Sequence, residues 1–143
     1  MAHMTESEAQ TFLAEPRVCI LSIAQRDRAP LTVPIWFHYA AGGNVGFWMD
    51  GASYKVKLLR ATPRLSLCVQ DERRPYRYVS VEGEVTSIAP IDFERDLKPL
   101  VARYLDAAGA AAYLAELGGA DGIAGDVWVT VTPRRWRAED LGR

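Results

Sequence analysis

The stretch RLSLCVQ, residues 64–70, alternates apolar and polar side chains along its whole length. Residues 78–88 follow after a charged loop and alternate in the same way. A two-residue period is typical of a strand with one buried face. Because the loop between the two segments is too short for a crossover helix, we expect these strands to pair antiparallel.

The segments on either side extend this sheet and add helices to it. Apolar runs bounded by turn residues predict four more strands, at residues 18–23, 31–39, 45–49 and 126–132. Helices are predicted at residues 9–14 behind a Thr5/Glu8 capping box, at 53–61, at 92–105 with a kink at Pro99, and at 110–117. The fold class is therefore mainly β (β+α), with six antiparallel strands in a sheet closed on itself and short helices at its ends.

Length and composition limit the class of protein. The 143 residues suffice for one hydrophobic core, so we expect a single domain over residues 5–143, and we interpret residues 1–4, MAHM, as a cloning remnant. With 49% hydrophobic residues and no apolar run long enough to cross a bilayer, we expect a soluble, cytoplasmic protein. The net charge of −1 gives no bulk attraction to nucleic acid or to a membrane, so an anionic ligand needs a local basic cluster.

Histidine and cysteine form no catalytic or metal-binding pattern. Cys19 and Cys68 each lie in an apolar run, and we interpret both as buried hydrophobic residues. His38 lies in a predicted strand and is interpreted as a structural residue. The sequence has neither the order of a Ser/His/Asp triad nor a metal-ligand spacing.

The most informative chemical pattern is DGASYKVKLLR, residues 50–60. A predicted strand ends at Met49 and a helix begins at Ser53, with Lys55 and Lys57 close to its start. Free N–H groups at a helix N-terminus and nearby ammonium groups both favour anions, so this junction suits a phosphate. The alternative is a solvent-exposed basic helix face, although cations there oppose the helix dipole unless an anion is bound.

Four motifs then occur in the order found in one known family. They are PLTVPIWF at residues 30–37, the strand at 45–49, residues 53–60 followed by TPRLSL, and VEGEV at 81–85. Together they resemble the pyridoxamine 5′-phosphate oxidase-like superfamily. The short chain and the Lys-x-Lys-x-x-Arg pattern are similar to its actinobacterial flavin/deazaflavin oxidoreductases, and the resemblance covers residues 12–136.

The resemblance implies a six-stranded split β-barrel homodimer that binds FMN or the deazaflavin coenzyme F-420 in two grooves at the dimer interface. Lys55 and Lys57 would hold the cofactor phosphate, with Ser53 and Arg60 nearby. The ring would lie along the backbone of a strand made by Val33, Pro34, Ile35 and Trp36, close to Met49.

Aromatic residues complete the site that the resemblance implies. Tyr76 and Tyr78 fall where the family often places a residue that reaches the cofactor from the other subunit, and Trp136, after the last predicted strand, would also line the pocket. Ordinary core or interface packing is the alternative for these rings.

The expected activity is hydride transfer from reduced coenzyme F-420 to a small organic substrate, with Tyr78 as candidate proton donor. Vitamin B6 oxidation is not expected, because the C-terminal Arg-x-His motif of true pyridoxamine phosphate oxidases is absent and Arg134 or Arg135 could supply only a loose anion contact. The loop cations Arg26, Arg28, Arg73, Arg74 and Arg77 would suit an acidic cofactor tail or would serve as solubilising charges. Two alternatives stay open: an FMN-dependent oxidase or reductase, and a non-catalytic carrier or sensor of F-420 or FMN.

Overall fold

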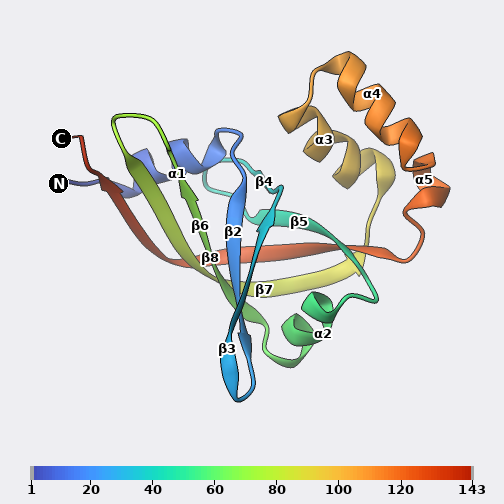
Figure 1. The fold of residues 1–143 in the computed structure, drawn as a ribbon, viewed down its shortest axis with the longest axis horizontal. Coiled ribbons are helices and arrows are strands. Elements are labelled where there is room, and N and C mark those ends of the chain that lie inside the picture. The colour runs from blue at the N-terminus through green and yellow to red at the C-terminus, as the bar shows by residue number, and fades with distance from the viewer. Residues whose placement is uncertain (1, 143) are drawn as a thin grey trace.

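The computed structural model describes residues 2–142 and is dominated by one antiparallel sheet (Figure 1). Its strands are β1 (Ala2–His3), β2 (Cys19–Gln25), β3 (Arg28–Ile35), β4 (His38–Tyr39), β5 (Val45–Asp50), β6 (Arg64–Gln70), β7 (Arg77–Pro90) and β8 (Asp126–Asp140). Its helices are α1 (Glu6–Ala14), α2 (Tyr54–Ala61), the π-helical turn η1 (Phe93–Leu97), α3 (Lys98–Tyr104), α4 (Ala107–Glu116) and α5 (Gly119–Gly122).

The strands follow the order β3-β2-β6-β7-β8-β5-β4, and β1 pairs with β8. The six longer strands are the six expected from the sequence, and the two further ones, β1 and β4, have two residues each. The mainly β (β+α) class and the split-barrel arrangement are therefore confirmed. Ala2–His3, interpreted above as part of a cloning remnant, pairs with Asp140 and Glu139.

The sheet is not closed on itself, which corrects one expectation. It is an open path that ends at β3 on one side and at β4 on the other. These two strands were predicted as one at residues 31–39, but the chain leaves the strand conformation at Trp36 and Phe37 and then crosses to the opposite end of the sheet. The break between β3 and β4 is thus the place where the barrel is split.

Tyr104 of α3 holds the chain in place at this break through hydrogen bonds. The hydroxyl of Tyr104 accepts a hydrogen bond from the Phe37 N–H at 3.1 Å and lies 2.7 Å from the Arg17 carbonyl oxygen, to which it donates. Burial raises the pKa of the Tyr104 hydroxyl, so the proton needed for that donation is retained. Its neighbour Arg103 donates to the carbonyl oxygens of Ala14 and Glu15 at the end of α1.

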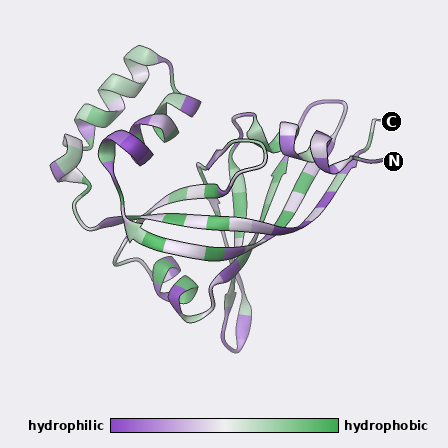
Figure 2. Ribbon diagram, turned by 180° about the vertical axis from the view of Figure 1, so that it is seen from behind, coloured by the Kyte–Doolittle hydropathy of each residue, from purple (hydrophilic) through white to green (hydrophobic). Residues whose placement is uncertain are grey.

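The main core lies inside the sheet and is built from the alternating strand residues. Leu65, Leu67 and Val69 of β6 are buried, as the two-residue period predicted, and hydrophobic segments run along the central strands in Figure 2. Cys19 is buried as expected, and burial raises the pKa of its thiol to about 12. Cys68 is exposed, contrary to the interpretation above, because it occupies an outward position of the same alternation.

Strand β8 is eight residues longer than the segment 126–132 that we predicted. Pro133 suggested an end, since proline has no N–H for the ladder. The strand continues because the register between β7 and β8 shifts beside Gly83, which pairs with Pro133. Trp136, expected in a tail after the last strand, therefore lies within β8 and packs against the main core.

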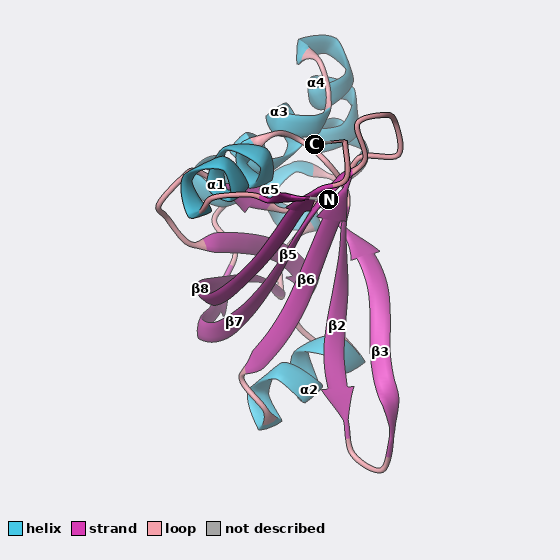
Figure 3. Ribbon diagram, turned by 90° about the vertical axis from the view of Figure 1, so that its left-hand side faces the viewer, coloured by secondary structure: helices cyan, strands magenta, loops and turns pink. Residues whose placement is uncertain are grey.

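The helices gather at the two ends of the sheet, with α2 at one end and α1, α3 and α4 at the other (Figures 1 and 3). The capping box of Thr5 and Glu8 is present at α1. The predicted helix at 92–105 is divided, as expected near Pro99, into η1 and α3. None of the helices within residues 2–142 is long and apolar enough to span a membrane.

Candidate functional site

The junction between β5 and α2 is a tight turn that presents the start of a helix. The Ser53 N–H donates to the Asp50 carbonyl oxygen at 3.0 Å, and the Ser53 hydroxyl accepts from the Val56 N–H as the N-cap. A Cβ on Gly51 would lie 2.3 Å from the Gly125 carbonyl oxygen, so only glycine allows this close approach to the loop before β8. The helix start predicted at Ser53 is confirmed.

Helix α2 carries three cations without an acidic residue in its first turn. Its apolar side, Val56 and Leu59, is buried in the main core. Lys55 is half-buried, whereas Lys57 and Arg60 are exposed, and none of the three has an ion-pair partner among residues 2–142. Cations near a helix N-terminus oppose the helix dipole, so this arrangement costs stability unless an anion compensates it.

The tip of the β2–β3 hairpin lies against the start of α2. The Tyr54 hydroxyl donates to Gln25 Oε1 at 2.9 Å, which ties the first turn of α2 to the end of β2. Arg28 begins β3 and Arg26 lies in the turn between the strands, both exposed. The hairpin therefore adds two cations to those of α2, with one weak contact from Arg26 to Asp27 at 3.8 Å.

Strand β3 runs from this cationic end of the molecule to the end covered by α3 and α4 (Figure 1). It pairs with β2 on one side and terminates the sheet. Val33 and Ile35 pack against the main core, whereas Pro34 is exposed. A strand that ends a sheet leaves backbone groups along its free edge, where a flat ligand can lie. Its eight residues span roughly 23 Å at about 3.3 Å per residue.

A pocket of about 410 Å³ opens at the far end of β3. Three of the predicted cofactor residues, Pro34, Ile35 and Trp36, line it. Its other lining residues come from the segment before β2, from β5 and from helices α3 and α4; they are Val18, Trp48, Leu100 and Tyr113. The Trp36 ring stacks on the ring of Tyr104, with centroids 4.7 Å apart and planes 8° from parallel.

Tyr76 and Tyr78 lie at the opposite end of the sheet from α2. Tyr78 pairs with Gln70, six residues along β6 from Arg64, where α2 leads into the sheet. Six residues of strand cover about 20 Å. Figure 1 shows the β6–β7 loop beside the chain termini and α2 at the other end. These tyrosines therefore cannot join Ser53 and Lys55 of their own chain in one site.

Two further predicted residues have mainly structural surroundings. The Met49 side chain is 3% exposed and belongs to the main core, so only its backbone borders the β5–α2 junction. The Trp136 ring meets the Tyr39 ring edge-on, with centroids 6.2 Å apart.

His38 lies in β4 opposite Gly46. Burial lowers the pKa of its imidazole, and the charge of Arg103 lowers it further, so the ring is neutral at pH 7.

The remaining arginines differ in their availability. Arg77 donates to Asp71 Oδ2 through Nη2 at 2.6 Å, and Arg17 donates to Oδ1 of the same carboxylate at 3.0 Å, so Arg77 is engaged in a structural network. Arg73 and Arg74 are exposed, near the end of the sheet that carries Tyr76 and Tyr78. Within residues 2–142, no three His, Cys, Asp or Glu side chains come together in a way that could hold a metal ion.

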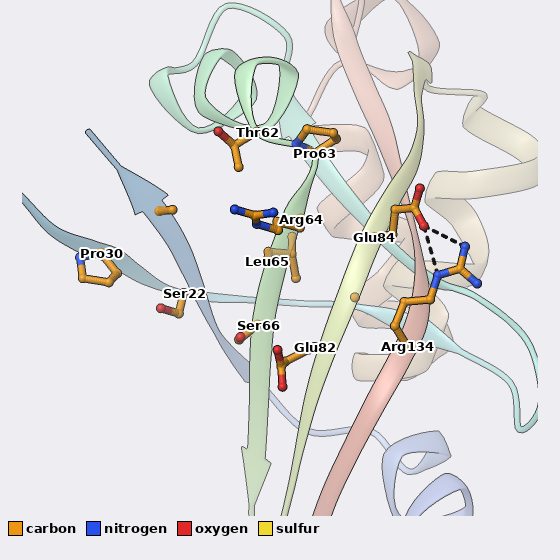
Figure 4. Close-up of a pocket in the computed structure, with 12 residues that line it drawn as sticks. Ser22, Pro30, Thr62, Pro63, Arg64, Leu65, Ser66, Glu82, Glu84 and Arg134 are labelled. Carbon is orange, nitrogen blue, oxygen red and sulfur yellow. Dashed lines mark hydrogen bonds and ion pairs between the residues drawn. The ribbon is translucent and has the colours of Figure 1, made fainter. Parts of the chain in front are cut away.

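A hollow of about 590 Å³ lies on the outer face of β2, β6 and β7 next to the end of α2 (Figure 4). Small side chains from neighbouring strands, Ser22 and Ser66, form its floor, and the Arg134 guanidinium at its rim donates to Glu84 Oε2 at 2.7 Å. None of the predicted cofactor residues lines it. Exposed Ile20 borders Cys68 on the same outer face, which therefore offers a flat and partly apolar surface.

Comparison with known proteins identifies the family. A family model described as pyridoxamine 5′-phosphate oxidase matches residues 5–140. The chain belongs to this family. Members of the pyridoxamine 5′-phosphate oxidase family are flavin-dependent oxidoreductases that bind flavin-type cofactors and commonly form dimers. No curated protein matches the chain.

Solved structures with low sequence identity to this chain share its fold. A conserved hypothetical protein, Rv2991 from Mycobacterium tuberculosis, is 23% identical, with a TM-score of 0.75 over 96% of this chain and 86% of that one. A protein described as an F420 reductase is 23% identical, with a TM-score of 0.63 over 89% of this chain and 94% of that one. An FAD-binding protein from Mesorhizobium loti is 20% identical, with a TM-score of 0.67 over 96% and 93%.

Sequence reasoning missed the residues that close the pocket at the end of β3. Trp48 is an outward residue of β5, while Leu100 and Tyr113 come from helices that follow β7. Their approach to Trp36 depends on how α3 and α4 pack against the sheet, and no local sequence pattern indicates this packing. The one available signal was the aromatic residue at an outward strand position, Trp48, in a predicted strand whose other face is apolar.

Proposed function

We propose that this chain is an F-420-dependent oxidoreductase that transfers a hydride between reduced coenzyme F-420 and a small organic substrate. The observation that carries the proposal is the set of cations without ion-pair partners among residues 2–142, Lys55, Lys57 and Arg60, at a capped helix start near the tip of the β2–β3 hairpin. A structurally similar protein that is described as an F420 reductase supports the same cofactor.

The donor set at the start of α2 fits a phosphorylated cofactor. Ser53 supplies a hydroxyl and Lys55 and Lys57 supply ammonium groups. The Asp50 carboxylate accepts from the Ala52 N–H and makes no ion pair with these lysines. The edge formed by Val33, Pro34, Ile35 and Trp36 would hold the planar ring through backbone contacts. When it is bound, the reduced deazaflavin ring supplies the hydride, and the protein supplies position and electrostatics.

The cations of the β2–β3 hairpin favour F-420 over FMN. Arg26 and Arg28 extend the positive surface of α2 because the Tyr54–Gln25 hydrogen bond brings the hairpin tip to the helix. A deazaflavin with an acidic tail would use these charges, whereas FMN ends at its phosphate.

A second copy of the chain would complete the site. Tyr76 and Tyr78 are too far from α2 within one chain, so they would reach the cofactor of a partner, with the Tyr78 hydroxyl as the candidate proton donor. The outer face of β2 and β6, with exposed Ile20 and the small side chains Ser22 and Ser66, is the surface on which we expect that copy to pack.

Titration of the protein with F-420 and with FMN tests this function. Lys55→Ala combined with Lys57→Ala should weaken F-420 binding by about 2–4 kcal/mol, since two charge-assisted contacts are lost. Lys98→Ala, an exposed lysine of α3 at the other end of the sheet, is the control and should leave affinity unchanged. Unchanged affinity in the double variant would remove the phosphate site.

Two further arms separate the alternatives. Arg26→Ala with Arg28→Ala should weaken the binding of F-420 but not that of FMN. Tighter binding of FMN than of F-420 by the unaltered protein would favour an FMN-dependent oxidase or reductase.

When the protein is mixed with reduced F-420 and a panel of quinones, enones and biliverdin, the cofactor should be oxidised. Saturable binding without oxidation would identify a carrier or sensor instead.

A further inference from the structure

Strand β8 pairs with β7 along almost its whole length, but its other edge is paired only at the two ends. On that edge β5 reaches as far as Val131, and β1 pairs with Glu139 and Asp140. Within residues 2–142, no strand pairs with residues 132–137 on this side, which we call the β8 edge. In Figure 1 this part of β8 runs along the left-hand margin of the sheet. Six residues span about 20 Å, which is enough for one short additional strand.

The backbone of the β8 edge presents groups that can pair with such a strand. The Met4 N–H donates to the Ala138 carbonyl oxygen at 3.0 Å, so Ala138 turns its carbonyl group toward this edge. Because backbone groups alternate in direction along a strand, Trp136 turns its N–H and carbonyl groups the same way. In the part of the chain that the structure describes, no strand lies there to bond them.

Two strands already occupy the same edge of β8, and both run antiparallel to it. Strand β1 ends at His3, and the chain turns away at Thr5, the N-cap of α1. Strand β5 begins at Val45, opposite Val131. The β8 edge is therefore a gap between two strands of the same direction, and a third strand of that direction fits between them. Addition of a strand to a sheet edge is one of the recurring ways in which proteins bind extended peptides.

A hollow lies on each side of the β8 edge. The hollow beside α1 has a volume of about 480 Å³, and the hollow on the outer face of the sheet has a volume of about 600 Å³. Met4, Arg135, Trp136 and Ala138 line both, so the two hollows meet at the edge. Successive side chains of a strand point to opposite faces, so a peptide on the β8 edge would direct alternate side chains into the two hollows.

The hollow beside α1 suits an apolar side chain. Met4, Pro133 and Trp136 line it, and the Trp136 ring packs against the main core. Glu6 also lines this hollow, so a carboxylate of the peptide would be repelled there.

The hollow on the outer face suits a carboxylate. Arg137 is exposed and has no ion-pair partner among residues 2–142, and Arg135 approaches Glu82 only at 4.0 Å. Arg134, in contrast, donates two hydrogen bonds to Glu84. Arg135 and Arg137 are therefore the two cations that remain available for charge-assisted contacts with a peptide.

The same features exclude most other strands. Proline, a bulge and like charges along an edge prevent indiscriminate pairing of sheets. The β8 edge has Pro133, the register shift beside it, and the row of arginines. For an acidic strand alone, the charges become attractive, so the edge selects by charge.

We infer that the β8 edge binds an extended acidic segment of another protein as an added antiparallel strand. Its carboxylates lie toward Arg135 and Arg137, and its apolar side chains lie toward Met4 and Trp136. The bound segment continues the line of β1 toward β5. The inference does not rest on the proposed function, because the β8 edge shares no residue with the proposed cofactor site at α2 and β3.

Fluorescence anisotropy with a fluorescein-labelled EVEVE peptide amide tests the inference. The unaltered protein should bind this peptide saturably, and the matched KVKVK peptide should not bind. A peptide residue opposite Trp136 shares its face of the sheet and turns its own N–H to β8, so the valine amides make the backbone bonds.

Methylated peptides separate strand addition from simple charge attraction. N-methylation of both valines should weaken binding at least about tenfold, since two backbone hydrogen bonds are lost. N-methylation of the central glutamate, whose N–H points to solvent, is the control and should change affinity little. Absence of EVEVE binding, or an equal loss with the two methylated peptides, would overturn the inference.

Arg137→Glu should reverse the preference for charge. The variant should lose affinity for EVEVE and gain affinity for KVKVK, a change that unfolding cannot produce. Arg26→Glu, at an exposed arginine of the β2–β3 turn far from the β8 edge, is the matched control and should alter neither affinity. Unchanged preference in Arg137→Glu would contradict the assigned location.

Amide hydrogen exchange locates the bound peptide. The Trp136 amide should exchange more slowly when EVEVE saturates the protein, whereas the Arg137 amide, which points to β7, should keep its rate. Binding without slower exchange at Trp136 would place the peptide elsewhere and overturn the inference. Slow exchange at Trp136 without peptide that is lost on dilution would assign the edge to a second copy of the chain, which would overturn it as well.

Discussion

The sheet and the helices between β7 and β8 bury their side chains to different extents. Every long strand except the edge strand β3 contributes buried residues to the main core, whereas within residues 2–142 the second core has three buried side chains, Leu97, Val101 and Ile123. Helix α4 buries no residue at all, although it is rich in alanine. The sheet therefore carries the proposed cofactor edge, and the more loosely attached helices α3 and α4 supply one wall of the pocket at the end of β3.

The largest effect should come from the main core. Phe47→Ala removes a fully buried ring from β5 and should lower the free energy of unfolding by about 3–5 kcal/mol. Urea denaturation measures the change, with Phe47→Leu as the variant that keeps most of the volume. A loss below about 1 kcal/mol would show that β5 does not share the main core.

A smaller and more local effect is expected in the second core. Leu97→Ala should cost about 2–3 kcal/mol, because the helices can partly collapse onto the cavity. Amide hydrogen exchange should accelerate in η1, α3 and α4 while the amides of β6 keep their protection. Equal acceleration in β6 would mean that the two cores unfold as one.

The contact between the two regions can be weakened at Tyr104. Tyr104→Phe keeps the ring that stacks on Trp36 but leaves the Phe37 N–H without its acceptor, which should cost about 1–3 kcal/mol. Thermal unfolding measures the loss. Tyr113→Phe is the matched control and should leave stability unchanged, because the Tyr113 hydroxyl has no partner among residues 2–142.

The smallest effect concerns the pH dependence of stability at the end of the sheet that carries Tyr76 and Tyr78. Burial raises the pKa of the Asp71 carboxyl, but hydrogen bonds and charges of Arg77 and Arg17 outweigh burial and hold it below its usual value. A lowered native pKa gives stability that is present above the unfolded value of about 3.9 and is lost as pH falls through the native value.

Asp71→Asn should therefore reduce stability at pH 7 by about 1 kcal/mol and make acid unfolding less steep. Denaturation at a series of pH values checks this. An unchanged acid limb would show that other carboxylates carry the pH dependence.

The sequence predicted those parts of the fold that depend on local periodicity. The alternation of residues 64–70 and the N-cap at Ser53 both reappear in the structure, since each is decided by neighbouring residues. The break at Trp36 and the continuation of β8 through Pro133 were missed, because a tertiary hydrogen bond to Tyr104 and a register shift beside Gly83 decide them.

The residues of the candidate site also differ in whether the sequence could predict their relative positions. Ser53, Lys55 and Lys57 could be placed together because they lie within one turn of a helix. The separation of Tyr78 from this helix, and the approach of Tyr113 to Trp36, depend on strand register and helix packing between distant segments. Such relations leave no mark in a single sequence.

The prolines of β3 have a consequence for the behaviour of the protein at high concentration. An open sheet edge can recruit further strands and seed fibres, and proline removes the N–H donors that such growth needs. Pro30 and Pro34 interrupt the free edge of β3, and the opposite end of the sheet, β4, offers only two residues. The chain can thus keep one edge accessible to a small molecule while blocking self-propagating assembly from it.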